Sequence, residues 1–196
     1  MVETESNASE MSKKGIQKPQ HKQPASSIHD AFPPNVFEAT EQNIQESALY
    51  LYDYINQVLG FPEHNIILFG RSIGTGPTTY IGSKRNPGSI IMMSSFKSIR
   101  DIVRDQAGMC MQYLVRNRFN NLERIDRLRS PTFFVHGLRD HLISYKHSKE
   151  LKDRCKAPSM LITPQLMDHN NFDFLEDLVQ PFNQFLHNHT ATCETL

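Results

Sequence analysis

The feature that most constrains this chain is a serine set between two glycines, directly after a short apolar run. Residues 65–69 read NIILF and residues 70–74 read GRSIG. The Gly-x-Ser-x-Gly spacing is typical of a sharp strand-to-helix turn, in which small residues let one backbone segment pass close to another. Gly70 and Gly74 are therefore expected to shape the turn and Ser72 to stand exposed on it. The competing interpretation is a glycine-rich turn with an incidental serine.

Beyond residue 40, short apolar runs alternate with longer segments of mixed polarity. The runs that predict strands are Ile66–Phe69, Ser89–Met93, Thr132–Val135 and Ser159–Thr163. The segments that predict helices are 41–59, 75–84, 99–116, 145–154 and 173–186. Near-continuous apolar runs are typical of strands buried on both faces, so the alternation predicts an α/β fold whose parallel sheet is flanked by helices.

Length and composition favour one domain between two tails. Of the 196 residues, 1–36 are rich in Ser, Lys, Gln, Glu and Pro and are expected to be disordered, 37–190 to form the domain, and 191–196 to form a second tail. Lys+Arg 21 balance Asp+Glu 21, which argues against a nucleic-acid partner. No run approaches the roughly 20 apolar residues of a membrane span and no signal peptide is evident, so a cytoplasmic protein is expected.

Neither a metal nor a cofactor is expected. The three cysteines, Cys110, Cys155 and Cys193, are far apart and fit reduced thiols better than a disulfide framework or a zinc site. The nine histidines include no pair at metal-binding spacing on one face of a helix or strand. A Gly-x-x-x-x-Gly-Lys-Ser/Thr phosphate loop is also absent from the sequence.

An acid and a histidine follow the last two predicted strands. A serine hydroxyl needs an imidazole to take its proton and a carboxylate to orient that imidazole. Asp140 lies a few residues beyond the strand at 132–135, at the sheet edge where ligand-facing groups of open α/β sheets collect. His169 lies in the loop after the strand at 159–163. The order Ser72, Asp140, His169 is the chain order of the α/β-hydrolase triad.

Other residues compete for these roles. Asp140 could instead serve a turn or cap a helix, since aspartate favours both positions. Asp168 is a second candidate acid, although a sequence neighbour is poorly placed to orient the ring of His169. His136, at the end of a predicted strand, is expected to be structural. Solvated positions are expected for the remaining candidates, which are His141, His147, His187 and His189.

Three segments together resemble the α/β-hydrolase superfamily: residues 69–78, the stretch from Ser130 to Asp140, and His169 before a helix. The chain is most similar to the α/β-hydrolase-domain protein-depalmitoylase group. The resemblance implies Ser72 as nucleophile, Asp140 as acid and His169 as base. It also implies acyl ester or thioester substrates, S-acylated proteins among them, and peripheral attachment to membranes. The cysteine-rich, lipid-modified N-terminus of that group has no counterpart here.

The predicted site lacks one recognisable part. The oxyanion of a tetrahedral intermediate needs two donors, of which one is the backbone N–H after the nucleophile, here Ile73. The other comes from a loop after an earlier strand, but no apolar strand run precedes residue 41. The chain therefore looks like part of a hydrolase domain whose N-terminal strands are missing. The sheet would then have an unpaired edge, through which two copies could pair.

Two functional classes follow from these residues. The first is a serine hydrolase of acyl esters or thioesters that works through an acyl-enzyme on Ser72. The second is a truncated α/β-hydrolase remnant, catalytically weak or inactive, that acts as a binding module. Apolar residues between Phe96 and Leu122 could line an acyl site or form an ordinary amphipathic helix packed on the sheet.

Overall fold

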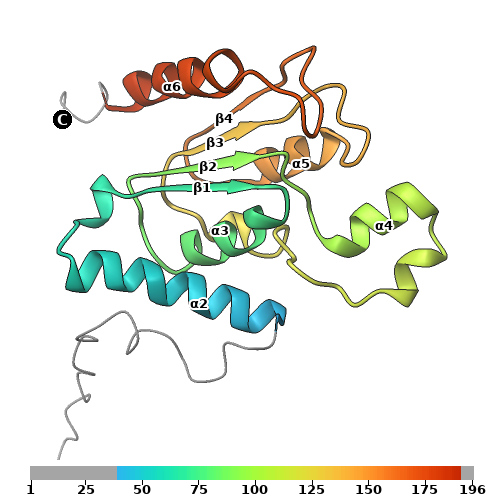
Figure 1. Ribbon diagram of the computed structural model, residues 1–196, viewed down its shortest axis with the longest axis horizontal. Helices are drawn as coiled ribbons and strands as arrows, with labels where there is room; N and C mark the ends of the chain where they lie inside the picture. The colour runs from blue at the N-terminus through green and yellow to red at the C-terminus, as the bar shows by residue number, and fades with distance from the viewer. Residues whose placement is uncertain (1–38, 191–196) are drawn as a thin grey trace, which may run out of the picture.

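The computed structural model describes residues 39–190, and its centre is a parallel sheet (Figure 1). The strands are β1 (Ile67–Arg71), β2 (Ser89–Met93), β3 (Thr132–Val135) and β4 (Ser159–Ile162), in the spatial order β1-β2-β3-β4. Every neighbouring pair is parallel. The predicted α/β class is confirmed, and each strand lies within two residues of its predicted bounds.

Helices cover the sheet and connect its strands. The α-helices are α2 (Glu41–Asp53), α3 (Thr75–Gly82), α4 (Ile99–Ala107), α5 (Lys146–Arg154) and α6 (Gln180–Thr190). Two π-helical segments, η1 (Tyr54–Val58) and η6 (Phe174–Val179), continue α2 and precede α6. The 3₁₀ turns are η2 (Glu63–Asn65), η3 (Ser72–Gly74), η4 (Met111–Leu114) and η5 (Ile125–Arg127).

The core is split by the sheet into two layers. Along β2, Ile90 and Met92 point to the layer that contains Leu151 of α5, while Ile91 and Met93 point to the layer that contains Phe185 of α6. This alternation is the period of two that a strand imposes on its side chains. Figure 1 shows α6 on one side of the sheet and α2 with α3 on the other. Both faces of β2 and β3 are therefore buried, as the apolar runs predicted.

Strand β1 departs from that expectation. Ile67 is 49% exposed and Phe69 is 50% exposed, whereas Leu68 between them packs on the α5 layer. Within residues 39–190, β1 pairs with β2 alone. The prediction that every strand is buried on both faces is wrong for β1, because the described part of the chain supplies no helix over this face. It is also wrong for the other edge strand, β4, none of whose residues is fully buried.

The helix predicted at 99–116 is shorter than expected. It ends at Ala107, since Gly108 has φ 91° and its N–H bonds to the carbonyl of Arg104. With ψ 166° as well, this backbone conformation is open to glycine but strained for a residue with a Cβ, so the helix cannot continue through it. The 3₁₀ turn η4 follows in place of further α-helix.

The predicted tails at 1–36 and 191–196, together with Cys193, lie outside the described residues. Cys110 and Cys155 are free thiols. Among the helices of the described region, none has the length and apolarity that crossing a bilayer demands.

Candidate active site

Ser72 sits at a strained turn between β1 and α3. Its φ is 51°, in the left-handed region that costs a residue with a side chain roughly 1–2 kcal/mol. The chain passes from the strand directly into η3 and then α3, and the Thr75 hydroxyl donates to the Ser72 carbonyl at 2.7 Å. Because the turn is this sharp, the serine hydroxyl stands at the carboxyl edge of the sheet.

The two flanking glycines do not play the same part. A Cβ on Gly70 would meet the Gly74 carbonyl oxygen at 2.8 Å and would come still closer to the Thr78 hydroxyl. The backbone can close on α3 only because this position lacks a side chain. A Cβ on Gly74 would meet nothing within 4 Å, and its φ is −63°. The expectation that Gly74 must be small is therefore wrong for the described residues, because none of them packs against it.

The three predicted side chains meet at this edge. His169 Nε2 lies 3.1 Å from Ser72 Oγ, and His169 Nδ1 lies 2.7 Å from Asp140 Oδ2. The residues come from the loops after β1, β3 and β4, which a parallel sheet brings to one edge. With the proton on Nδ1 donated to the carboxylate, Nε2 is free to accept the Ser72 hydroxyl proton.

Comparisons with known proteins point to α/β-hydrolases. No protein-family model matches the chain. Human α/β-hydrolase domain-containing protein 17B is 22% identical over 147 residues, covering 75% of this chain and 50% of the relative. The Caenorhabditis elegans α/β-hydrolase domain-containing protein aho-3 is 25% identical, covering 75% of this chain and 43% of the relative. This chain thus spans about half the length of these relatives.

Solved structures give the fold. The chain matches Est1E from Butyrivibrio proteoclasticus with a TM-score of 0.61 and 17% identity, covering 78% of this chain and 71% of that one. Acetyl xylan esterase 1 from Thermoanaerobacterium matches with a TM-score of 0.57 and 14% identity, covering 79% and 56%. This chain has an α/β-hydrolase fold. Its strand-turn-helix at Ser72 has the β1–η3–α3 arrangement described above.

In this α/β-hydrolase fold the Asp140 carboxylate contacts both the loop that follows it and the His169 imidazole. Its Oδ1 accepts hydrogen bonds from the N–H groups of Leu142 at 3.0 Å and Ile143 at 2.8 Å, and its Oδ2 faces His169. Burial by itself would raise the pKa of the Asp140 carboxyl, but hydrogen bonds from His136, the Ile143 N–H and His169 hold that pKa well below its usual range. A role in the turn and a contact with the imidazole are therefore compatible, because each uses a different oxygen.

The loop that carries His169 is fixed from both sides. The Arg71 guanidinium donates to the His169 carbonyl and, at 3.1 Å, to Asn170 Oδ1. It also lies over the Phe172 ring, 5.5 Å from the centroid. Asp168 Oδ1 accepts at 2.7 Å from the N–H groups two and three residues later, so it shapes the loop and leaves the imidazole to Asp140. Arg71 occupies a variable position of the Gly-x-Ser-x-Gly pattern, and no signal in the sequence indicated its role.

His136 supports the acid from behind. It is buried, as a structural histidine should be, with Nε2 2.8 Å from the Ile143 carbonyl and 3.3 Å from Asp140 Oδ2. Its Nδ1 lies 2.6 Å from Ser148 Oγ, which fixes Nε2 as the protonated nitrogen if the serine donates. The contact with Asp140 was missed by sequence reasoning, although the spacing of four residues after a strand could have indicated it.

The predicted position of one histidine is wrong. His147 was expected in solvent but is 1% exposed, with Nε2 3.0 Å from Asp105 Oδ2 and Nδ1 accepting from the Lys97 N–H. The first turn of α5 faces α4 at this point, which periodicity within α5 cannot reveal. His141 and His187 are exposed as predicted, and the side chain of His189 lies outside the described residues.

Of the two oxyanion donors that the sequence predicted, residues 39–190 supply one, the Ile73 N–H. Ile73 lies in the first turn of the η3–α3 helix, where backbone N–H groups lack intrahelical acceptors. In residues 39–190, β1 has a neighbour on its β2 side and none on the other. The loop expected to bring the second donor therefore has no counterpart among these residues. The same residues contain no cluster of His, Cys, Asp or Glu able to hold a metal ion.

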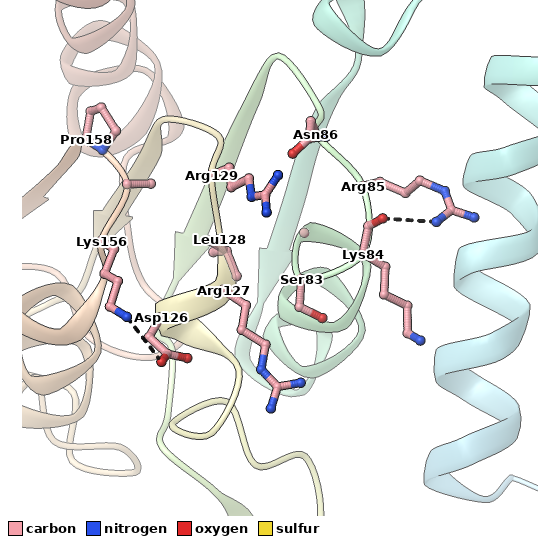
Figure 2. Close-up of a pocket in the computed structure, with 12 residues that line it drawn as sticks. Ser83, Lys84, Arg85, Asn86, Asp126, Arg127, Leu128, Arg129, Lys156 and Pro158 are labelled. Carbon is pink, nitrogen blue, oxygen red and sulfur yellow. Dashed lines mark hydrogen bonds and ion pairs between the residues drawn. The ribbon is translucent and has the colours of Figure 1, made fainter.

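A cavity of about 750 Å³ lies at the opposite end of the sheet from Ser72 (Figure 2). Its lining comes from residues 82–86, 126–129 and 156–158, the segments that lead into β2, β3 and β4. None of the three site residues lines it. This cavity is therefore separate from the chemistry at the carboxyl edge.

Proposed function

We propose that the chain is a serine hydrolase of acyl esters or thioesters, with S-acylated proteins among its substrates. The observation that carries the proposal is the continuous line of contacts from Ser72 through His169 to Asp140, on a strained strand-to-helix turn. Relatives called α/β-hydrolase domain-containing proteins and fold neighbours called esterases support a hydrolase. The thioester, the protein substrate and a cytoplasmic location at membranes rest on the sequence resemblance.

Acylation begins when Ser72 Oγ attacks the acyl carbonyl carbon. His169 Nε2 takes the hydroxyl proton as the oxygen–carbon bond forms, and Asp140 stabilises the resulting imidazolium. The Ile73 N–H donates to the oxyanion of the tetrahedral intermediate. The intermediate collapses as the bond to the alcohol or thiol breaks, and His169 returns its proton to that leaving group. Ser72 is left as an acyl ester.

Deacylation repeats the chemistry with water. His169 Nε2 removes a proton from a water molecule, whose oxygen attacks the acyl-Ser72 carbonyl. The second tetrahedral intermediate releases a carboxylic acid, and His169 gives the proton back to Ser72 Oγ. All the acid–base work is done by one imidazole, whose orientation depends on Asp140 and on the Arg71-bound loop.

A second candidate function follows from the single oxyanion donor and the free edge of β1 in the described residues. The chain covers about half of its relatives, and its described residues supply one oxyanion donor. Losing one such donor costs roughly 10²–10³ in turnover in a well-studied protease. A catalytically weak or inactive α/β-hydrolase fold that acts as a binding module is therefore the alternative.

Fluorophosphonate labelling separates the two functions. The probe should attach to Ser72 of the folded chain, as located by mass spectrometry of the labelled peptide, and the label should disappear in Ser72→Ala. Ser83→Ala is the matched control, since Ser83 Oγ is engaged by the Tyr80 carbonyl far from the site. Absence of labelling in folded wild type would favour the binding module. Labelling that persists unchanged in His169→Ala would show that another group is the base.

A further inference from the structure

Several cationic residues line the cavity at the amino ends of the strands. Five of its lining residues are basic and one, Asp126, is acidic. The basic residues are Lys84, Arg85, Arg127, Arg129 and Lys156. The chain as a whole has a formal net charge of +0, so this concentration of positive charge is a local property of the cavity.

Some of these basic side chains form ion pairs with carboxylates of the described residues, and others do not. Arg85 binds both carboxylate oxygens of Asp53 at 2.7 Å, and Lys156 lies 3.7 Å from Asp126. Arg127 and Arg129 are exposed, and within residues 39–190 neither guanidinium has a hydrogen-bond or ion-pair partner. Two planar forks of N–H donors therefore remain available in the cavity.

The carboxyl end of α3 does not account for these two arginines. Cations often lie at the carboxyl end of a helix because its last carbonyls carry partial negative charge. The last carbonyls of α3 already accept from the N–H groups of residues 83–85 and from Ser83 Oγ. Arg127 is the last residue of the single-turn 3₁₀ helix η5, and Arg129 lies in the segment between η5 and β3.

We propose that this cavity binds a phosphate-bearing ligand through Arg127 and Arg129. A guanidinium binds phosphate oxygens through two parallel hydrogen bonds, and ligand pockets typically have volumes of about 300–1,000 Å³, a range that includes this one. Figure 2 shows Arg129 extending into the space between its own segment and the turn at Asn86. The exposed amide of Asn86 adds neutral donors on that side.

Calorimetric titration of the full chain with pyrophosphate at low salt tests the site. We expect saturable binding to one site that weakens as salt is added. Arg127→Gln and Arg129→Gln should each lower the affinity at least about tenfold, and Arg129→Lys, which keeps the charge without the fork, should lie between wild type and Arg129→Gln. Arg139→Gln is the matched control, because Arg139 is exposed at the opposite end of the sheet.

Two results would overturn the site. One is wild type that shows no saturable binding; the other is Arg139→Gln that weakens binding as much as Arg129→Gln. Unfolding temperatures equal to wild type establish that the variants are folded. The readout does not involve hydrolysis, so it is independent of the proposed activity of Ser72.

Sedimentation with vesicles identifies the source of the phosphate. Binding to phosphatidylcholine vesicles that contain phosphatidylinositol 4-phosphate, abolished by Arg129→Gln and absent for phosphatidylcholine alone, would assign the cavity to a lipid headgroup. Binding of free pyrophosphate without vesicle binding would assign it to a soluble phosphate compound. Both results support an Arg129-dependent phosphate site.

Discussion

Single residues carry the proposed chemistry by making two contacts each. Asp140 divides its oxygens between a turn and an imidazole, and Arg71 divides its guanidinium between a carbonyl and an amide of the His169 loop. In both cases the side chain fixes a loop and a reacting group together. Substitutions at these positions should therefore change the reaction more than they change the fold.

Replacing Asp140 tests whether its carboxylate sets the tautomer of the His169 imidazole. In Asp140→Asn the amide can donate to His169 Nδ1, so the proton moves to Nε2, which can then no longer accept from Ser72. We expect kcat for a p-nitrophenyl ester to fall about 10⁴-fold. An unchanged kcat in Asp140→Asn, with Asp168→Asn inactive, would move the acid to Asp168.

The low pKa of Asp140 predicts how stability depends on pH. The folded state favours the carboxylate, so its contribution is fully present above the unfolded carboxyl pKa of about 4 and is lost as pH falls toward the lower folded pKa. We expect the free energy of unfolding of wild type, from urea titrations, to fall below about pH 4. The fall should be shallower in Asp140→Asn. Parallel curves for the two proteins would contradict the assigned shift.

Removing the Arg71 fork should loosen the His169 loop. Arg71→Gln loses the hydrogen bond to the His169 carbonyl and the ring contact with Phe172. Misplacement of the imidazole should lower kcat by about 10- to 100-fold while KM changes little. Arg139→Gln, an exposed arginine in the neighbouring loop, should retain wild-type kcat. A change confined to KM would place Arg71 in substrate binding instead.

At the scale of elements, the ends of helices and strands decide where side chains meet. Helix α4 stops at Gly108, and η4 folds back so that the Val115 carbonyl accepts from Arg100. Gln106, near the end of α4, donates to the carbonyls of His141 and Leu142 beside Asp140. In a continuous helix to residue 116, as the sequence predicted, Val115 would lie about four turns beyond Arg100 and could not accept from it.

The stop at Gly108 can be tested by stability. Gly108→Ala places a Cβ at φ 91° and should lower the free energy of unfolding by about 1 kcal/mol. Gly74→Ala is the control, because its φ is −63° and a Cβ there meets nothing within 4 Å. Urea denaturation should separate the two variants. Equal losses would mean that the backbone conformation at Gly108 is not the cause.

At the scale of the molecule, the sheet of residues 39–190 has two edge strands, β1 and β4, and two inner strands. Strands β2 and β3 are covered on both faces, whereas β1 has one free edge and two half-exposed apolar side chains in residues 39–190. Free strand edges pair readily with other chains. The predicted dimer through this edge remains a prediction.

Light scattering tests that dimer. If the dimer forms, the wild-type chain should have the mass of two copies. Ile67→Lys puts a charge on the exposed face of β1 and should lower the measured mass to that of a monomer. Ile44→Lys is the control, since Ile44 is 39% exposed on α2 and belongs to no strand. A wild-type chain that is monomeric at high concentration would rule out pairing through β1.

The sequence by itself determined the order of elements and the residue types of the site. Near-continuous apolar runs, helical spacing and a Gly-x-Ser-x-Gly turn are local signals, readable within a few residues. They located all four strands and proposed Ser72, Asp140 and His169, which the structure brings together.

Only the tertiary structure decided what surrounds those residues. Ser72 and His169 are 97 positions apart, and Arg71 and the His169 carbonyl are 98 apart. Contacts of that range depend on how strands lie side by side, which no local period records. The same reason explains the buried His147, the support of Asp140 by His136 and the exposed face of β1. The Gly-x-Ser-x-Gly turn thus followed from local sequence, while the geometry around Ser72 depended on the assembled sheet.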